Sequence, residues 1–339
     1  MTGNSGQRRF PAEWEPTEAI WISWPHNLDT WPGRFDRLPD FYASWTRLMA
    51  DVLPIRILAA AGVAKSAQSQ LGNHPNIELI PIPTNDCWIR DYGPSFVHCG
   101  QHLRAIDWQY NAWGGKYPPW DDDNRAATLI SKYAGLNCQH SDLCLEGGAI
   151  ETDGSGRLLT TPCLLTKSRN PAWTKEQIAE HLYETLGVTE IAWIDGGALQ
   201  GDDTDGHIDQ LARFVDEGNV VVATSENNND PNTAGLQTNL RQLEIWGSTT
   251  DPIVQVHPMP IPPARFIDGV RVPESYCNFL TLGDQCTLVP VFGCQQTDQR
   301  AIGLLGDLLS MDVIGVDCRD LVWGLGALHC ASLNQPCAI

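Results

Sequence analysis

Short apolar runs alternate with amphipathic stretches of helical length, and this alternation constrains the fold of the chain more than any other feature. The predicted strands are residues 55–60, 78–82, 95–99, 158–161, 190–194, 220–223, 287–291 and 313–316. The predicted helices between them include residues 41–53, 174–186 and 298–309. Apolar runs of this length suit buried strands, whereas a 3.6-residue period suits helices that pack on a sheet. The mixed order predicts an α/β fold.

Glycine-rich segments form a weak internal repeat. They are residues 111–115 (NAWGG), 144–148 (CLEGG), 193–197 (WIDGG) and 321–326 (LVWGLG). Such a repeat suits similar modules around a centre, although a chain with 30 glycines can produce it by chance. No linker interrupts the chain, and residues 225–233 (SENNNDPNT) look like a surface loop. We therefore expect one catalytic domain over residues 1–339.

The balance of charges limits the partners of the protein. Lys and Arg number 22 against 41 Asp and Glu, which gives a formal charge of −19. Such a surface repels nucleic acid and anionic membranes and attracts cations, although it also serves solubility alone. The first 16 residues lack the apolar core of a secretory signal, and eleven scattered cysteines contain no C-x-x-C pair. These features predict reduced thiols in a cytoplasmic protein with no membrane span.

Reactive side chains concentrate in five segments beside glycine or proline. The segments are residues 85–94 (NDCWIRDYGP), 145–148 (LEGG), 202–209 (DDTDGHID), 275–279 (SYCNF) and 324–330 (GLGALHC). Unpaired Asp, Glu and Arg are rarely buried, so clusters of them at strand ends are candidates for a site. Arg90 is expected to pair with a nearby acid, and Asp86 to brace the loop that carries Asp91.

These segments belong to a longer ordered series that resembles a known family. The series adds residues 10–16 (FPAEWEP), 24–25 (WP), 113–123 (WGGKYPPWDDD), 210–214 (QLARF) and 335–336 (QP). Together they resemble the agmatine deiminases and bacterial-type peptidylarginine deiminases of the guanidino-modifying pentein superfamily. The resemblance implies a pentein α/β-propeller of five ββαβ modules. It also implies hydrolysis of agmatine to N-carbamoylputrescine and ammonia, a step of polyamine metabolism.

The resemblance implies a role for each of three catalytic residues. Cys330 matches the nucleophile, and a thiolate suits attack on the carbon of a resonance-stabilised guanidinium. His207 matches the general acid that protonates the departing nitrogen and later activates water. Glu146 matches the carboxylate that orients His207. No cofactor and no metal are expected.

Four further residues are candidates for binding the substrate. Asp91 and Asp209 match the carboxylates that grip the planar, permanently cationic guanidinium. Trp88 either stacks on the substrate or belongs to the core. Asn278 matches a position near the site, and its role is open. The expected partner is a small cationic guanidino compound. The oligomeric state stays open, and a homo-oligomer is one possibility.

Other interpretations stay open from the residues alone. A single buried cysteine is more often an apolar filler than a nucleophile, and His207-x-Asp209 could be part of a metal site. A peptidyl-arginine deiminase, a non-catalytic guanidine or polyamine binder and a metal hydrolase are therefore alternatives. The family motif Gly-Gly-Gly-Asn-Ile-His-Cys is also altered here, since Leu325 replaces its middle glycine and Ala327 its asparagine.

Overall fold

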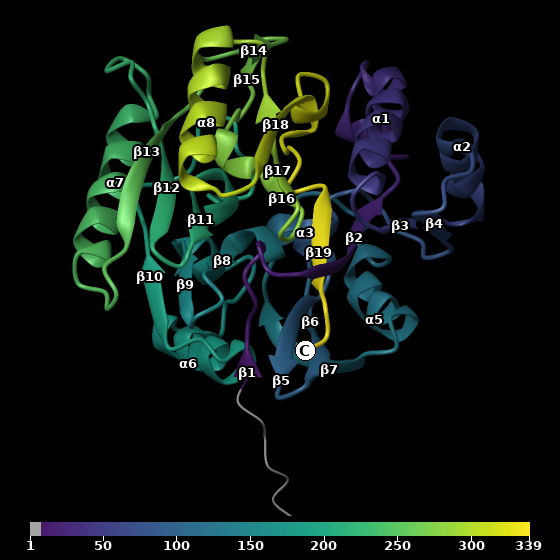
Figure 1. Ribbon diagram of the computed structural model, residues 1–339, viewed down its shortest axis with the longest axis horizontal. Coiled ribbons are helices and arrows are strands. Elements are labelled where there is room, and N and C mark those ends of the chain that lie inside the picture. Colours follow the sequence, from purple (N-terminus) through teal and green to yellow (C-terminus); the bar gives the residue numbers. More distant parts are fainter. Residues whose placement is uncertain (1–7) are drawn as a thin grey trace, which may run out of the picture.

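The computed structural model describes residues 8–339, and five of the six sheets in this range share one topology (Figure 1). In each of the five, two strands pair antiparallel, and a helix connects the second strand to a third that pairs with it in parallel. The repeat is therefore a ββαβ unit. The mixed α/β fold predicted from the sequence is confirmed.

The unit that joins the two ends of the chain is extended by one strand and one helix. Its last strand in sequence lies beside its first, as the yellow and purple arrows of Figure 1 show. Its elements are β19 (Ser332–Pro336), β2 (Thr17–Ser23), α1 (Leu38–Ala50), β3 (Ile55–Leu58), α2 (Ala61–Leu71) and β4 (Ile77–Ile80).

The other four units follow one another along the chain. Their elements are β5 (Ser95–Cys99), β6 (His102–Gln109), α5 (Asp123–Tyr133) and β7 (Asn137–Cys144); β8 (Ile150–Thr152), β9 (Arg157–Thr160), α6 (Lys175–Leu186) and β10 (Glu190–Trp193); β11 (Ala212–Asp216), β12 (Asn219–Thr224), α7 (Thr233–Gly247) and β13 (Gln255–Pro260); and β16 (Leu280–Thr281), β17 (Cys286–Val291), α8 (Gln295–Leu308) and β18 (Asp312–Asp317). Strand β1 (Arg8–Arg9) is added to the edge of the first of these sheets.

Three short elements lie outside the repeat. The helices α3 (Ile89–Tyr92) and α4 (Ala112–Gly115) follow β4 and β6, and the hairpin of β14 (Phe266–Ile267) and β15 (Val270–Arg271) forms the sixth sheet.

Every predicted strand and helix has a counterpart, with ends that shift by a few residues. The helix expected at residues 41–53 begins earlier, at Leu38, because Pro39 suits the first turn of a helix. The helix expected from residue 174 is capped by a reciprocal pair of hydrogen bonds, in which Thr174 accepts from the Gln177 N–H and Gln177 accepts from the Thr174 N–H. The loop expected at residues 225–233 is a loop up to Asn232.

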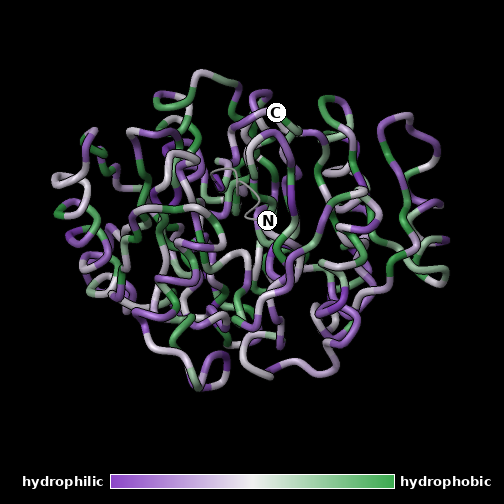
Figure 2. Tube along the Cα trace, turned by 90° about the horizontal axis from the view of Figure 1, so that it is seen from below, coloured by the Kyte–Doolittle hydropathy of each residue, from purple (hydrophilic) through white to green (hydrophobic). Residues whose placement is uncertain are grey.

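Apolar side chains from all units form the core. In α6, Ile178, Leu182 and Leu186 recur on one face and are fully buried against the neighbouring sheets. Figure 2 shows hydrophobic and hydrophilic positions alternating along the trace, without a long continuous apolar segment. None of the helices within residues 8–339 combines the length and the apolar character needed to cross a bilayer. The expectation about a secretory signal falls partly on residues 1–7, which lie outside the described residues.

Three of the four glycine-rich segments occupy corresponding places in the fold, after the third strand of a unit, whereas residues 111–115 follow β6, the second strand of its unit. Each lies shortly after the end of a strand, namely β6, β10, β7 and β18. Glycine permits close approach of other groups at such bends. At Gly147, for example, an added Cβ would clash with the carbonyl oxygen of Arg90. The segments after β6, β7 and β18 lie at the site described next.

Candidate active site

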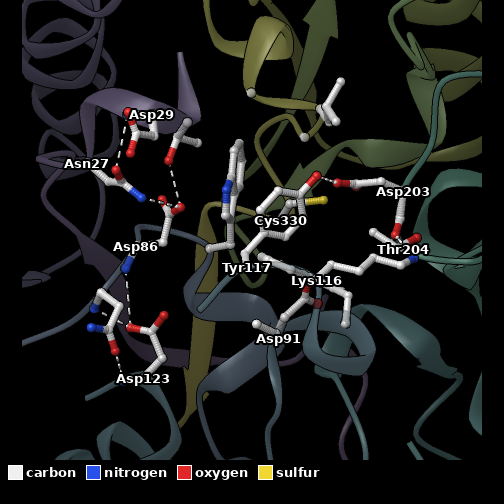
Figure 3. Close-up of a pocket in the computed structure, with 18 of the residues that line it drawn as sticks. Asn27, Asp29, Asp86, Asp91, Lys116, Tyr117, Asp123, Asp203, Thr204 and Cys330 are labelled. Atoms are coloured by element: carbon white, nitrogen blue, oxygen red, sulfur yellow. Dashed lines mark hydrogen bonds between the residues drawn. The ribbon is translucent and has the colours of Figure 1, made fainter. Parts of the chain in front are cut away.

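A cavity of about 720 Å³ opens above Cys330 (Figure 3). Asp91, Trp88 and Trp113 also line it. Figure 3 shows Asp29, Asp86 and Asp123 on one side of the cavity and Asp203 with Thr204 on the other. The predicted nucleophile is therefore accessible from a pocket, although its residue is only 5% exposed.

The loop that carries Cys330 is held by Asn278, which lies in a 3-10 turn at Tyr276–Asn278. Its Oδ1 accepts the backbone N–H groups of Ala327 (3.2 Å) and Cys330 (3.3 Å), and its Nδ2 lies 3.1 Å from the Cys330 Sγ. Asn278 is fully buried and contacts the nucleophile from behind instead of lining the cavity. Its amide therefore fixes the position of the sulfur.

The two predicted guanidinium-binding carboxylates converge beside the sulfur. Asp91 lies in α3, where its Oδ2 accepts from Trp113 Nε1 (2.8 Å) and its Oδ1 from the Gly148 N–H (2.9 Å). The Oδ2 of Asp209 lies 3.5 Å from the Cys330 Sγ. A Cβ added to Gly148 would lie 2.7 Å from Asp91 Oδ1 and 3.0 Å from Asp209 Oδ2, so both oxygens face one small space.

His207 reaches the same space and lies between two carboxylates. Its Nδ1 is 3.5 Å from Asp91 Oδ1, and its Nε2 is 3.7 Å from Glu146 Oε2. A Cβ on Gly148 would lie 2.8 Å from the same Nδ1. Within residues 8–339, neither ring nitrogen has a hydrogen-bond partner, and neither does Asp209 Oδ1. Buried polar atoms of this kind usually have partners, so this arrangement is suited to a polar ligand.

The charges around His207 set its protonation. Burial alone would lower the pKa of His207, but Asp91 and Glu146 outweigh it and raise this pKa to about 9. Burial also raises the pKa of Asp91 to about 6. Between about pH 6 and about pH 9, His207 is therefore an imidazolium and Asp91 is a carboxylate. Such a histidine can donate a proton at neutral pH.

Glu146 is held in place by Arg169, a residue to which the sequence analysis assigned no role. The Nε of Arg169 donates to both oxygens of Glu146 (2.8 and 2.9 Å), and its Nη1 donates to Asp205 (2.7 Å). Burial opposes ionisation of Glu146, yet His207 and Arg169 hold its pKa below the ordinary value. Glu146 therefore stays negative beside His207 at all moderate pH values.

A second buried network lies behind Asp209. His329 Nδ1 is 2.8 Å from Asp209 Oδ2, and His329 Nε2 is 3.0 Å from Glu13 Oε2. Glu13 also pairs with Arg90 (3.1 Å) and Arg213 (3.3 Å). Burial opposes ionisation of Asp209, but the hydrogen bond to His329 and nearby positive charges keep its pKa below the ordinary value.

The thiol of Cys330 is neutral in this environment. Burial, with the charges of Asp209 and Asp91, raises its pKa well above the ordinary value. A bound cation would offset both carboxylates and thereby favour the thiolate.

The structure thus brings together all seven residues singled out from the sequence. The pairing expected for Arg90 is confirmed, as is the bracing role of Asp86, which accepts the Cys87 N–H (2.7 Å) within the loop before α3. Sequence reasoning assigned no role to five residues that contact the site, although most belong to the quoted motifs: Glu13, Trp113, Arg169, Arg213 and His329.

A candidate cation-binding group exists elsewhere. Asp107, Cys138 and His140 offer ligand atoms within 4.8 Å of one another. The Asp107 oxygen already lies 2.9 Å from His140 Nδ1 and accepts the Thr128 hydroxyl (2.6 Å), so the group is satisfied without an ion. All three lie in β6 or β7 and outside the cavity of Cys330.

The chain is similar in sequence to known deiminases. The family model described as Porphyromonas-type peptidyl-arginine deiminase matches residues 9–336. A protein of Legionella pneumophila is 34% identical over 99% of this chain and 98% of its own length. The agmatine deiminase of Pseudomonas aeruginosa is 33% identical, with 97% of this chain and 95% of that protein covered.

Solved structures agree with the sequence relatives. The agmatine deiminase of Enterococcus faecalis superposes with a TM-score of 0.89 at 28% identity, covering 98% of this chain and 97% of that chain. A cysteine-to-serine variant of the C. jejuni agmatine deiminase with substrate bound gives a TM-score of 0.90, also at 28% identity and with the same coverage. An amidinotransferase from Microseira wollei shares the fold alone, with a TM-score of 0.56 at 14% identity over 96% of both chains.

Proposed function

The chain belongs to the Porphyromonas-type peptidyl-arginine deiminase family, and we propose that it hydrolyses agmatine to N-carbamoylputrescine and ammonia. As a family member it is a hydrolase of C–N bonds in amidines. One observation carries the proposal for the site: Asp91, His207 and Asp209 each place an atom within about 3 Å of a single point, the Cβ position of Gly148. The Cys330 sulfur lies 3.5 Å from the same Asp209.

The proposed first half-reaction forms a covalent adduct. Asp91 and Asp209 hold the guanidinium by charge-assisted hydrogen bonds, which fix its plane beside the sulfur. The Cys330 thiolate attacks the guanidinium carbon and forms a tetrahedral adduct. His207, an imidazolium at neutral pH, protonates one nitrogen, which leaves as ammonia. An S-alkylthiouronium on Cys330 remains.

The second half-reaction releases the product. His207 is now neutral and removes a proton from the attacking water. The new tetrahedral adduct then collapses: the C–S bond breaks, the proton of its hydroxyl group passes to the departing sulfur, and the ureido product leaves with the thiol of Cys330 restored. Asp91 and Glu146 stabilise the imidazolium each time it forms, which suits a residue that alternates between acid and base.

The lining of the cavity favours a substrate with a second positive charge. Its acidic members are Asp29, Asp86, Asp91, Asp123 and Asp203, against a single lysine, Lys116. Lys116 is itself paired with Asp205 at 2.9 Å. Burial raises the pKa of Asp86 and of Asp203, so a cation beside them would favour their ionised forms. Agmatine carries an ammonium at the end opposite its guanidinium.

Turnover of a substrate panel tests this function. Purified protein is incubated with agmatine, arginine and an arginyl peptide, and both ammonia and the ureido product are measured. We expect turnover with agmatine and retained binding without turnover in Cys330→Ser. Turnover of arginine or peptide alone would change the substrate, and binding of agmatine without consumption by the parent protein would leave a binder. Loss of activity to a chelator, but not to a thiol alkylator, would favour a metal hydrolase.

We also propose that the five ββαβ units close into a pentein propeller within one catalytic domain of 339 residues. The shared topology of five sheets and the likeness to the amidinotransferase support this arrangement. A cytoplasmic location is supported by eleven free cysteines, since such thiols suit a reducing compartment. Sedimentation of the purified protein will give the oligomeric state.

A further inference from the structure

Strands β6 and β7 place three metal-ligating side chains on one face of their sheet. The two strands pair in parallel, with Asp107 opposite His140 and Ala105 opposite Cys138. Side chains two residues apart on a strand point to the same side, so Cys138 lies on the face that carries Asp107 and His140. A ligand atom of each of these three residues lies within 4.8 Å of the other two. The pairing of the strands therefore assembles the group.

Helix α5 packs against this face and holds one of the three side chains (Figure 1). Asp107 is buried, and its Oδ2 accepts the hydroxyl of Thr128 in α5 at 2.6 Å. The same oxygen lies 2.9 Å from Nδ1 of His140, whose side chain is 68% exposed. The carboxylate is thus oriented by an outer hydrogen bond, as metal-binding carboxylates are, and the group is open to solvent on the side of His140.

The contacts that satisfy the group without an ion do not prevent an ion from binding. In a four-coordinate zinc site, ligand bonds of about 2.0 to 2.3 Å place neighbouring ligand atoms about 3.3 to 3.6 Å apart. The Asp107 and His140 atoms are 2.9 Å apart, and no pair in the group exceeds 4.8 Å. Small side-chain rotations therefore close the three atoms around an ion, with the ring proton of His140 on Nε2 and the lone pair of Nδ1 directed at the ion.

The ligand atoms identify the ion that suits the group. Ca²⁺ and Mg²⁺ take oxygen ligands, whereas zinc accepts sulfur, nitrogen and oxygen together. Three protein ligands and one water are a usual coordination of zinc, and the open side at His140 leaves room for that water. The formal charge of −19 also favours the binding of a cation. The group is separate from the site at Cys330, since none of its three residues lines that cavity.

We propose that Asp107, Cys138 and His140 bind one zinc ion, with water as the fourth ligand. As the bond between zinc and sulfur forms, the thiol of Cys138 gives its proton to solvent, because the thiolate is the ligand. Asp107 binds as a carboxylate and His140 as a neutral imidazole. The two anionic ligands balance the two positive charges of the ion.

The ion joins two strands that lead to the active site. Strand β6 leads to the loop of Trp113, whose Nε1 donates to Asp91 at 2.8 Å. Strand β7 leads to Glu146. Bound zinc ties β6 to β7 at Asp107 and therefore stabilises the unit from which both segments emerge. The role expected of the ion is structural, because its ligands lie outside the catalytic cavity.

Cobalt serves as a coloured probe of the site. A bond between Co²⁺ and a thiolate absorbs in the near ultraviolet, and four-coordinate Co²⁺ gives strong visible bands. Titration of the full-length Cys330→Ser variant excludes the active-site thiol as a ligand. We expect about one equivalent of Co²⁺ to bind with both signals, and zinc to displace it, since such ligands hold zinc more tightly. The displacement gives the zinc affinity, and zinc should raise the unfolding midpoint.

Substitutions in the same Cys330→Ser background assign the ligands. Cys138→Ser should remove the thiolate band and the zinc-dependent rise of the unfolding midpoint. His140→Ala should weaken zinc binding by at least about 100-fold, and Thr128→Val, which removes only the outer hydrogen bond, by about tenfold. Cys294→Ser is the matched control: Cys294 is also a partly buried free cysteine, but it precedes α8 and lies outside the group, so both signals should persist.

A thiolate band that is missing from the titration, or one that persists in Cys138→Ser, would overturn the proposal. Equal zinc affinities with and without His140→Ala would do the same and would indicate an adventitious ion only. If Cys138→Ser does not fold, His140→Ala carries the test, because the His140 side chain is largely exposed. The outcome is independent of the proposed function: absence of agmatine turnover leaves this site intact, and a failed titration leaves the chemistry at Cys330 intact.

Discussion

Replacing Glu146 by Gln is the sharpest test of the charges around His207. The amide keeps the shape of the carboxylate but removes a negative charge 3.7 Å from the His207 Nε2. His207 is fully buried, so neighbouring carboxylates, not water, stabilise its imidazolium. We expect the general acid to lose its proton at lower pH in the variant. The alkaline limb of the pH profile of kcat/KM should therefore move down.

The size of the shift follows from the distances. A rise in the His207 pKa from 6.5 to about 9 corresponds to roughly 3 kcal/mol in favour of the imidazolium. One carboxylate at about 4 Å contributes on the order of 4 kcal/mol at an effective dielectric constant near 20. Its loss should therefore move the alkaline limb down by about two to three pH units. Activity should fall by tens of fold near about pH 8, but by no more than about twofold near about pH 6.

Because of the same charges, His207 makes the free energy of unfolding depend on pH. The folded-state pKa of His207 lies above its unfolded value of about 6.5. Its contribution to the free energy of unfolding is therefore fully present below about pH 6.5 and is lost as the pH rises through about 9. In Glu146→Gln the folded-state pKa is lower, so this loss should end at lower pH and be smaller.

The assay measures initial rates of ureido product formation from about pH 5.5 to about pH 9.5, a range that brackets both limbs. Glu151→Gln is the matched control, because Glu151 is a buried carboxylate that pairs with Arg213 and not with His207. The reasoning is refuted if both variants keep the alkaline limb of the parent protein, or if Glu146→Gln loses activity by one factor at every pH. Thermal unfolding reports separately on the loss of the contact between Glu146 and Arg169.

Three further substitutions probe the site. Gly148→Ala places a methyl 2.7 Å from an Asp91 oxygen, where the guanidinium is proposed to bind, so kcat/KM should fall by at least about 100-fold while Cys330 alkylation persists. Trp113→Phe removes the hydrogen bond to Asp91 and should lower kcat/KM by about tenfold or more, whereas Trp108→Phe, which loses only a bond to a serine hydroxyl, should not. Leu325 has φ of 69°, a left-handed conformation that costs a non-glycine residue about 1 kcal/mol. Leu325→Gly relieves this strain and should keep the unfolding midpoint of the parent protein, whereas Leu325→Ala keeps the strain and should lower the midpoint. Equal midpoints for the two variants would contradict this.

The sequence alone predicted much of the local structure. The strand at residues 95–99 was predicted with its observed ends, because its apolar run is short and bounded by polar and glycine residues. The strands at residues 17–23 and 332–336 were not predicted, although they pair with each other along their length. Their pairing joins the two ends of the chain, and no local pattern reports such a distant partner.

The amino-acid sequence determined which groups are available: the thiol of Cys330, the carboxylates of Asp91, Asp209 and Glu146, and the imidazole of His207, each within a short motif. Only the tertiary structure decided how protons are distributed among them. His207 and His329 are the same side chain, yet one lies between Asp91 and Glu146 and the other also faces Arg90 and Arg213. A pKa depends on burial and on charges brought from distant parts of the chain, so folding decided that the pKa of His207 is raised and that of His329 is lowered.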